Sequence, residues 1–104
     1  MIGFDTLDRT ILSDIEKERE RQYKKWGPQQ HTERQWDAIF EEEMAEFRCK
    51  LVCGYDFEEC YKELIESIAV LCAWARDMIG RKYGIYGEER KGYYEEDSKH
   101  NDVG

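Results

Sequence analysis

Four glutamates form two short pairs in the central part of the chain. Glu43 and Glu46 are three residues apart, and so are Glu63 and Glu66. On an α-helix, residues at this spacing lie next to each other on one face, so each pair offers two oxygen ligands to one cation. Four carboxylates that meet across two packed helices repel one another unless cations lie between them. The spacing therefore predicts a site for divalent cations.

The ligand types favour magnesium over a softer metal. Mg²⁺ prefers oxygen ligands and is commonly held by a few carboxylates together with substrate phosphates. No His or Cys falls within either pair, and the Glu-x-x-His motif of the iron-carboxylate bundles does not occur in the sequence. We therefore expect Mg²⁺, with Mn²⁺ able to replace it. A solvated helix face is the alternative for each pair, because a chain with 24 acidic residues contains Glu-x-x-Glu by chance.

Composition limits the partners and the compartment. The chain has 104 residues, a length typical of one domain, and its formal net charge of −8 argues against a nucleic acid polymer as partner. No apolar run approaches the length of a membrane span, and the first residues lack the pattern of a signal peptide. We expect a soluble, cytoplasmic protein whose four cysteines are free thiols; zinc bound by Cys49, Cys53 and Cys60 is the alternative.

Three helices are expected to position the glutamates. The first runs from a cap at Asp5 or Thr6 to Trp26, where Gly27 and Pro28 end it. The second begins at Thr32, with Gln35 completing a capping box, and ends at Gly54. The third covers residues 57–82, with Asp56 as its cap and Glu59 three residues further on, the same pattern as Thr32 and Gln35. Because the turn between the second and third helices is short, these two should be antiparallel neighbours.

Apolar stripes run along the second and third helices. The stripe on the second helix consists of Trp36, Phe40, Met44, Phe47 and Leu51. The stripe on the third consists of Tyr61, Leu64, Ile65, Ile68, Cys72, Ala75 and Ile79, and the opposite side carries Glu63, Glu66, Val70, Ala73, Trp74 and Asp77. A helix that is apolar on two sides is expected to be enclosed on both. The pattern predicts an all-α fold, with a helical domain over residues 1–82, a Tyr/Gly-rich and acidic arm over 83–104, and disorder in the last ten residues.

The order of these motifs resembles the signature of the all-α, MazG-like nucleoside triphosphate pyrophosphohydrolases. That signature reads Glu-Glu-x-x-Glu, an intervening segment and then Glu-x-x-Asp. Here it appears as Glu42-Glu43-Met44-Ala45-Glu46 followed by Glu63-Leu64-Ile65-Glu66. The upstream stretch over residues 18–27, leading to His31, is similar to small bacterial and phage members of the group. Glu66 departs from the pattern, because the family usually has Asp at this position.

The resemblance implies an antiparallel helical bundle of three main helices, completed by dimerisation into a homodimer or a dimer of dimers. It implies hydrolysis of a (deoxy)nucleoside triphosphate to the monophosphate and pyrophosphate. Glu43, Glu46, Glu63 and Glu66 would ligate magnesium, a metal-bound water would attack the α-phosphorus, and Glu42 would assist as a nearby carboxylate or base.

Residues before the second helix and late in the third are candidates for substrate binding. Trp26 could stack on a base, His31 could reach a sugar or phosphate, and Lys25 could contact phosphates. Core packing is the alternative for Trp26, and a solvated loop position is the alternative for His31. Asp77 follows Glu66 on the same side of its helix and could be an accessory ligand.

Two other functions fit the same sequence. An acidic helical interaction protein would explain the net charge and the acidic C-terminal end. A family member that binds nucleotide without cleaving it would explain Glu66. Magnesium should raise the melting temperature if a metal site exists, whereas an acidic interaction protein should be nearly indifferent to it.

Overall fold

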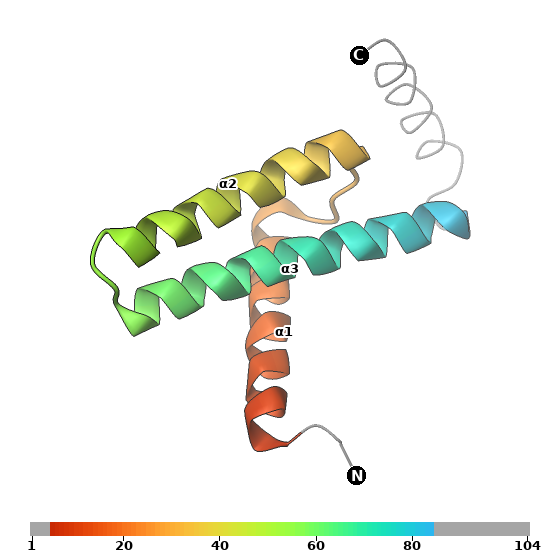
Figure 1. Cartoon of the computed structure of the whole chain (residues 1–104). Helices are drawn as coiled ribbons and strands as arrows, with labels where there is room; N and C mark the ends of the chain where they lie inside the picture. The colour runs from red at the N-terminus through yellow and green to blue at the C-terminus, as the bar shows by residue number, and fades with distance from the viewer. Residues whose placement is uncertain (1–4, 85–104) are drawn as a thin grey trace.

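The computed structural model of the chain describes residues 5–84. Within this range it contains three α-helices and no strand: α1 (Thr6–Trp26), α2 (Glu33–Val52) and α3 (Phe57–Lys82) (Figure 1). The expected all-α fold is confirmed. The expected C-terminal arm lies almost entirely outside the described residues. Among residues 5–84, no helix combines the length and the apolar content that a membrane span requires.

Side-chain caps begin all three helices where the sequence predicted them. Asp5 accepts a hydrogen bond from a backbone N–H in the first turn of α1, and Asp56 does the same for α3. Thr32 and Gln35 form a complete capping box at the start of α2. α1 ends at Trp26, before a glycine with φ of 72°, a conformation that residues with a β-carbon rarely adopt. α2 ends at Val52, slightly before the expected glycine.

α2 and α3 lie side by side and are joined by a short loop, whereas α1 crosses them at a steep angle (Figure 1). The buried apolar side chains come from α2 and α3, and they are Trp36, Cys60, Ile65, Ala69 and Val70. α1 adds one buried residue, Gln22. It is also fastened to α3 by a hydrogen bond of 2.6 Å from the Tyr61 hydroxyl to Asp14. The core is thus a helix pair with a third helix laid across it.

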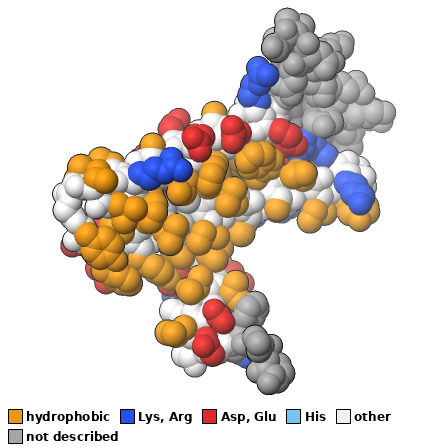
Figure 2. Space-filling model, viewed as in Figure 1, with side chains coloured by type: hydrophobic (Ala, Val, Ile, Leu, Met, Phe, Trp, Pro, Cys, Tyr) orange, Lys and Arg blue, Asp and Glu red, His pale blue; other side chains and the backbone are white. Residues whose placement is uncertain are grey.

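One side of α3 is less enclosed than the sequence predicted. Ile65 is buried, but Leu64, Leu71 and Ile79 are 37%, 42% and 55% exposed. Figure 2 shows hydrophobic side chains continuing over the visible face of the helix pair. The expectation of enclosure on both sides is therefore wrong for the single chain, because α1 and α2 together do not surround α3.

Candidate metal centre

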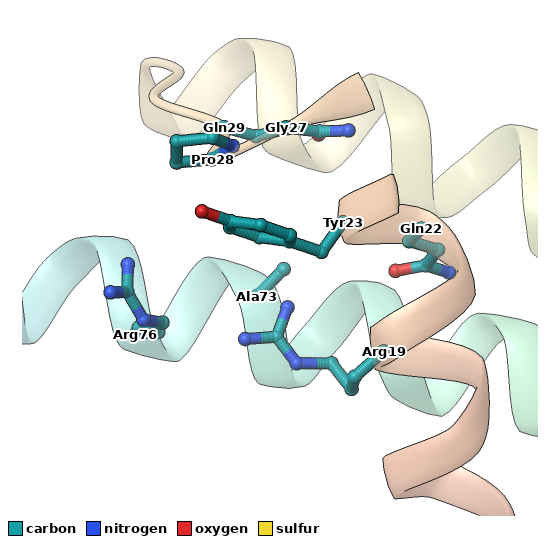
Figure 3. A pocket seen from close by; sticks show the side chains of 8 residues that line it. All are labelled: Arg19, Gln22, Tyr23, Gly27, Pro28, Gln29, Ala73 and Arg76. Atoms are coloured by element: carbon teal, nitrogen blue, oxygen red, sulfur yellow. The ribbon is translucent and has the colours of Figure 1, made fainter. Parts of the chain in front are cut away.

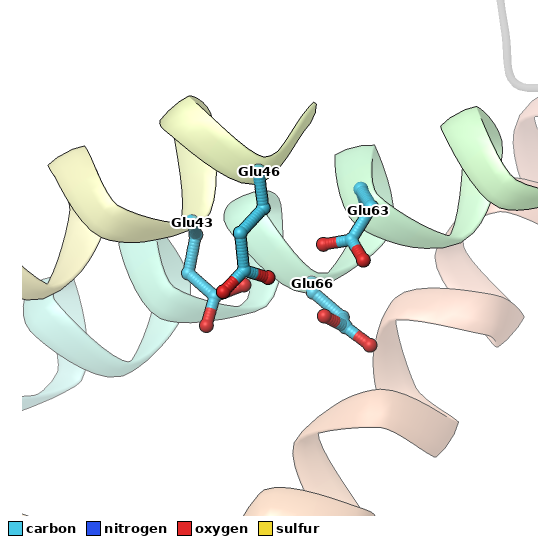
Figure 4. A group of neighbouring side chains, drawn as sticks. All are labelled: Glu43, Glu46, Glu63 and Glu66. Atoms are coloured by element: carbon cyan, nitrogen blue, oxygen red, sulfur yellow. The ribbon is translucent and has the colours of Figure 1, made fainter. Parts of the chain in front are cut away.

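The four predicted glutamates meet at one place. Glu43 and Glu46 extend from α2, and Glu63 and Glu66 extend from the neighbouring stretch of α3 (Figure 4). One carboxylate oxygen from each residue can be chosen so that all four lie within 4.8 Å of one another. The two pairs therefore form one group of oxygen atoms that could hold a metal ion.

Two contacts between α2 and α3 lie on either side of the glutamate cluster. Near one end, the indole Nε1 of Trp36 donates a hydrogen bond of 2.8 Å to Asp77 Oδ2. Near the other end, Lys50 Nζ lies 2.9 Å from Glu59 Oε1. The glutamate cluster lies between these two contacts along the helices. A shift of one helix by a single turn would break both contacts and separate the pairs.

Burial divides the cluster into an inner and an outer part. Glu63 is 9% exposed, Glu43 and Glu66 are half-buried, and Glu46 is exposed. The Oε2 atoms of Glu43 and Glu63 are buried and have no hydrogen-bond partner among the described residues. Buried polar atoms are normally satisfied, because leaving one unpaired costs about 1–3 kcal/mol. Two unpaired carboxylate oxygens at one place would suit a positively charged ligand.

The surroundings of Glu43 and Glu63 also disfavour the ionised form of each carboxyl group. The pKa values of Glu43 and Glu63 are each raised to about 7, from an ordinary value of 4.5. Burial is the largest cause for both, followed by the negative charges of Glu66 and then Glu46. A divalent cation among these carboxylates would favour their ionised forms, and it would give the two buried oxygens a partner.

An ion pair on α1 is influenced by the charges of the cluster, and sequence reasoning missed it. Arg21 donates two hydrogen bonds to Glu18, from Nε at 2.9 Å and from Nη2 at 2.6 Å, and Gln22 Nε2 donates a third at 3.1 Å. These bonds with Glu18 raise the pKa of Arg21, and the charges of Glu66 and Glu43 raise it further. The spacing of Glu18 and Arg21 on one face of a helix was the available signal.

Asp77 lies outside the cluster. It is 11 residues beyond Glu66, which corresponds to about 16 Å along the helix. Its side chain is 1% exposed, and Oδ2 accepts hydrogen bonds from the indole of Trp36 and from the backbone N–H of His31, the latter at 3.0 Å. The structure thus gives Asp77 the role of joining the end of α3 to the start of α2.

The other predicted residues are not part of the glutamate cluster. The His31 ring packs edge-on against Trp36, with 4.7 Å between centroids, and its Nε2 lies 3.1 Å from Gln29 Oε1. This half-buried position replaces the solvated loop that was the alternative for His31. Trp26 is exposed rather than packed in the core, and Lys25 Nζ lies 4.7 Å from its ring centroid. Glu42 is exposed on α2 and is not part of the cluster.

Comparison of the chain with protein-family models, with curated proteins and with solved structures gave no match. The resemblance to the MazG-like enzymes therefore rests on the motif residues alone. The geometry by itself defines the class of site: an all-oxygen cluster of four carboxylates, drawn from two helices, that could hold a divalent cation.

Proposed function

We propose that the protein is a magnesium-dependent nucleoside triphosphate pyrophosphohydrolase, which cleaves a (deoxy)nucleoside triphosphate to the monophosphate and pyrophosphate. The observation that carries this proposal is the convergence of the four glutamates within 4.8 Å, on the residues of the motif that resembles the MazG-like enzymes. Their order along the chain suggests the reaction, and their convergence supports it.

The residues fit magnesium. Glu43, Glu46, Glu63 and Glu66 offer only oxygen atoms, and the buried oxygens of Glu43 and Glu63 lack a partner. When bound, magnesium would neutralise charge on the phosphate chain and make a water molecule more acidic. The exposure of Glu46 leaves the cluster accessible to a phosphate chain from solvent.

The chain's own side chains would orient the substrate. Arg21 lies close enough to the cluster to be influenced by Glu43 and Glu66, and its guanidinium could meet a phosphate oxygen there. Glu42 would accept a proton at the exposed edge of α2. The exposed ring of Trp26 and the ammonium group of Lys25 would contact the base or the phosphates beyond the cluster.

A second copy of the chain would complete the fold. We propose that α2 and α3 act as an antiparallel pair and that the exposed side chains Leu64, Leu71 and Ile79 of α3 pack against a second copy in a homodimer or a dimer of dimers. These residues recur at intervals of seven and eight, so they follow one side of the helix. A helix face of this kind is commonly covered in helical bundles.

The buried oxygens favour a metal site over an acidic interaction surface. A surface that attracts a basic partner would present its carboxylates to solvent. Glu43 and Glu63 instead hold one oxygen each out of solvent and against other carboxylates, an arrangement that is unfavourable without a cation.

Pyrophosphate release tests the proposal. Canonical and modified triphosphates would be screened with Mg²⁺ and with Mn²⁺, and at least one should be turned over. Glu43→Gln and Glu63→Gln should each lower kcat/KM by about a hundredfold or more, because each removes a charge that the metal requires. The matched control is Glu41→Gln, which changes an exposed residue of α2 outside the cluster. Absence of turnover across the whole screen would remove the proposal.

A further inference from the structure

A cavity lies at the junction of α1 and α3, apart from the glutamate cluster. It is a cavity of about 90 Å³ between the second half of α1, the Gly27–Gln29 loop and α3. Figure 3 shows the Tyr23 side chain extending between this loop and α3, with Arg19 and Arg76 on the α3 side of the ring. None of the four clustered glutamates lines the cavity. Arg76 is ten residues beyond Glu66, or about 15 Å along the helix.

The charge of this cavity is opposite to that of the chain. Both charged residues among the described lining are arginines, Arg19 from α1 and Arg76 from α3, although the chain carries a formal net charge of −8. The polar lining also includes the amides of Gln22 and Gln29 and the hydroxyl of Tyr23. Two cationic side chains from different helices thus line one cavity, and such a grouping favours an anion over a cation.

The position of Arg19 is not explained by the end of α1. The partial negative charge at a helix C-terminus favours basic residues in the last turn, and in α1 these are Lys24 and Lys25. Arg19 lies about two turns earlier, and it forms no ion pair with the residues that the structure describes. Its position in the cavity wall therefore has no evident structural cause.

The chemistry and the size of the cavity select one kind of ligand group. Guanidinium groups bind phosphate and carboxylate oxygens through paired hydrogen bonds, and arginine is suited to phosphate recognition. The volume of about 90 Å³ is well below the roughly 300 Å³ at which pockets for whole small molecules begin. The cavity accommodates a single tetrahedral group rather than an entire nucleotide.

We propose that this cavity is an anion site that binds a phosphate group, as free phosphate or as the phosphate of a monoester, and that it does so without a divalent cation. Arg19 and Arg76 hold the anion from two sides. Tyr23 and the side-chain amide of Gln29 donate further hydrogen bonds. The site is separate from the glutamate cluster, so it does not depend on the proposed hydrolysis.

The test is an NMR titration of the full chain, labelled with ¹⁵N, in excess EDTA and at constant ionic strength. Sodium phosphate should produce saturable shifts confined to amides near Arg19, Tyr23, Gln29 and Arg76. A second arm with a nucleoside monophosphate distinguishes the sources: tighter binding than phosphate indicates a monoester, and equal binding indicates the free ion. Chelation keeps the glutamate cluster from contributing, so failure here leaves the proposed hydrolysis standing.

Variants decide whether the arginines are responsible. Arg19→Gln and Arg76→Gln should each weaken phosphate binding by about tenfold or more. Arg48→Gln makes the same change of charge at an exposed position of α2, and it should leave phosphate binding unchanged. Circular dichroism would confirm folding, and Arg19→Lys provides a second variant that keeps the charge but loses the paired geometry. Non-saturable shifts, or equal weakening by Arg48→Gln, would overturn the proposal by showing a general ionic effect only.

Discussion

At the scale of single residues, the main feature is a group of partly buried carboxylates that repel one another. Glu43 and Glu63 are held against other glutamates and partly away from water, and the pKa of each is raised to about 7. A protein that needed these residues only for solubility would leave them on the surface. Because their ionisation is unfavourable in the folded state, the free energy of unfolding should depend on pH.

Without metal, we expect stability to fall as pH rises from about 4.5 to about 7. The folded pKa values of Glu43 and Glu63 are raised above the unfolded value of 4.5, so the folded state binds more protons in this window. Urea unfolding in EDTA should show a lower free energy of unfolding at pH 7.5 than at pH 5. The double variant Glu43→Gln/Glu63→Gln should flatten this slope, and magnesium should stabilise the wild type at pH 7.5. A slope that both Gln substitutions leave unchanged would contradict the pKa shifts.

Arg21 provides a second prediction at this scale. If it meets the phosphates of the substrate, Arg21→Gln should lower kcat/KM by about tenfold or more, because a hydrogen bond to a charged group is lost. The measurement is steady-state pyrophosphate release, with Arg48→Gln as the control for the change in net charge. Equal activity of the two variants would place Arg21 outside substrate binding.

At the scale of elements, the cluster depends on how α3 is fastened to the start of α2. Asp77 accepts one hydrogen bond from the Trp36 indole and one from the His31 backbone, and it is almost completely buried. Through these bonds it holds the loop before α2 and the first turns of α2 against α3. Asp77 is therefore a structural residue that helps to keep the two glutamate pairs in register.

Asp77→Ala should destabilise the protein by about 2–4 kcal/mol, because it leaves one buried donor and one half-buried donor without this acceptor. Chemical denaturation measures the change. Asp77→Asn is the matched variant, since it keeps one side-chain oxygen as an acceptor and should lose less. A loss of less than about 0.5 kcal/mol in Asp77→Ala would show that the contact does not fasten the helices.

At the scale of the whole molecule, the three helices leave one side of α3 uncovered. The exposed apolar side chains there, Leu64, Leu71 and Ile79, lie outside the buried core formed by α2 and α3. Burial of apolar area contributes about 25 cal/mol per Å². The proposed association with a second copy would remove this surface from water.

Leu71→Asp should convert an oligomer to a monomer without unfolding the chain, because Leu71 contributes to the exposed side rather than to the buried core. Sedimentation velocity would measure the mass, and circular dichroism would measure the helix content. Val52→Asp is the control, since Val52 is exposed at the end of α2 and lies outside this stripe. A wild-type chain that is monomeric at micromolar concentrations would contradict the proposed dimer.

Local patterns made much of the fold and of the cluster predictable. Thr32 and Asp56 bond to backbone groups three residues away, so their capping roles can be recognised from short segments. The glutamate spacing likewise follows from helical geometry, and the short turn places the two pairs on adjacent helices. The pairing of Glu18 with Arg21 is also local to one helix. The influence of the cluster on Arg21 instead depends on where α1 crosses the other two helices.

The sequence by itself determined where the helices begin and end and which four carboxylates could converge, because these depend on interactions within one helix or across one short turn. Only the tertiary structure decided what depends on the crossing of α1: the influence of Glu43 and Glu66 on Arg21, and the cavity lined by Arg19 and Arg76. It also decided that Asp77 joins helices instead of joining the cluster. The crossing angle of two helices arises from the packing of many side chains, and no single spacing along the chain encodes it.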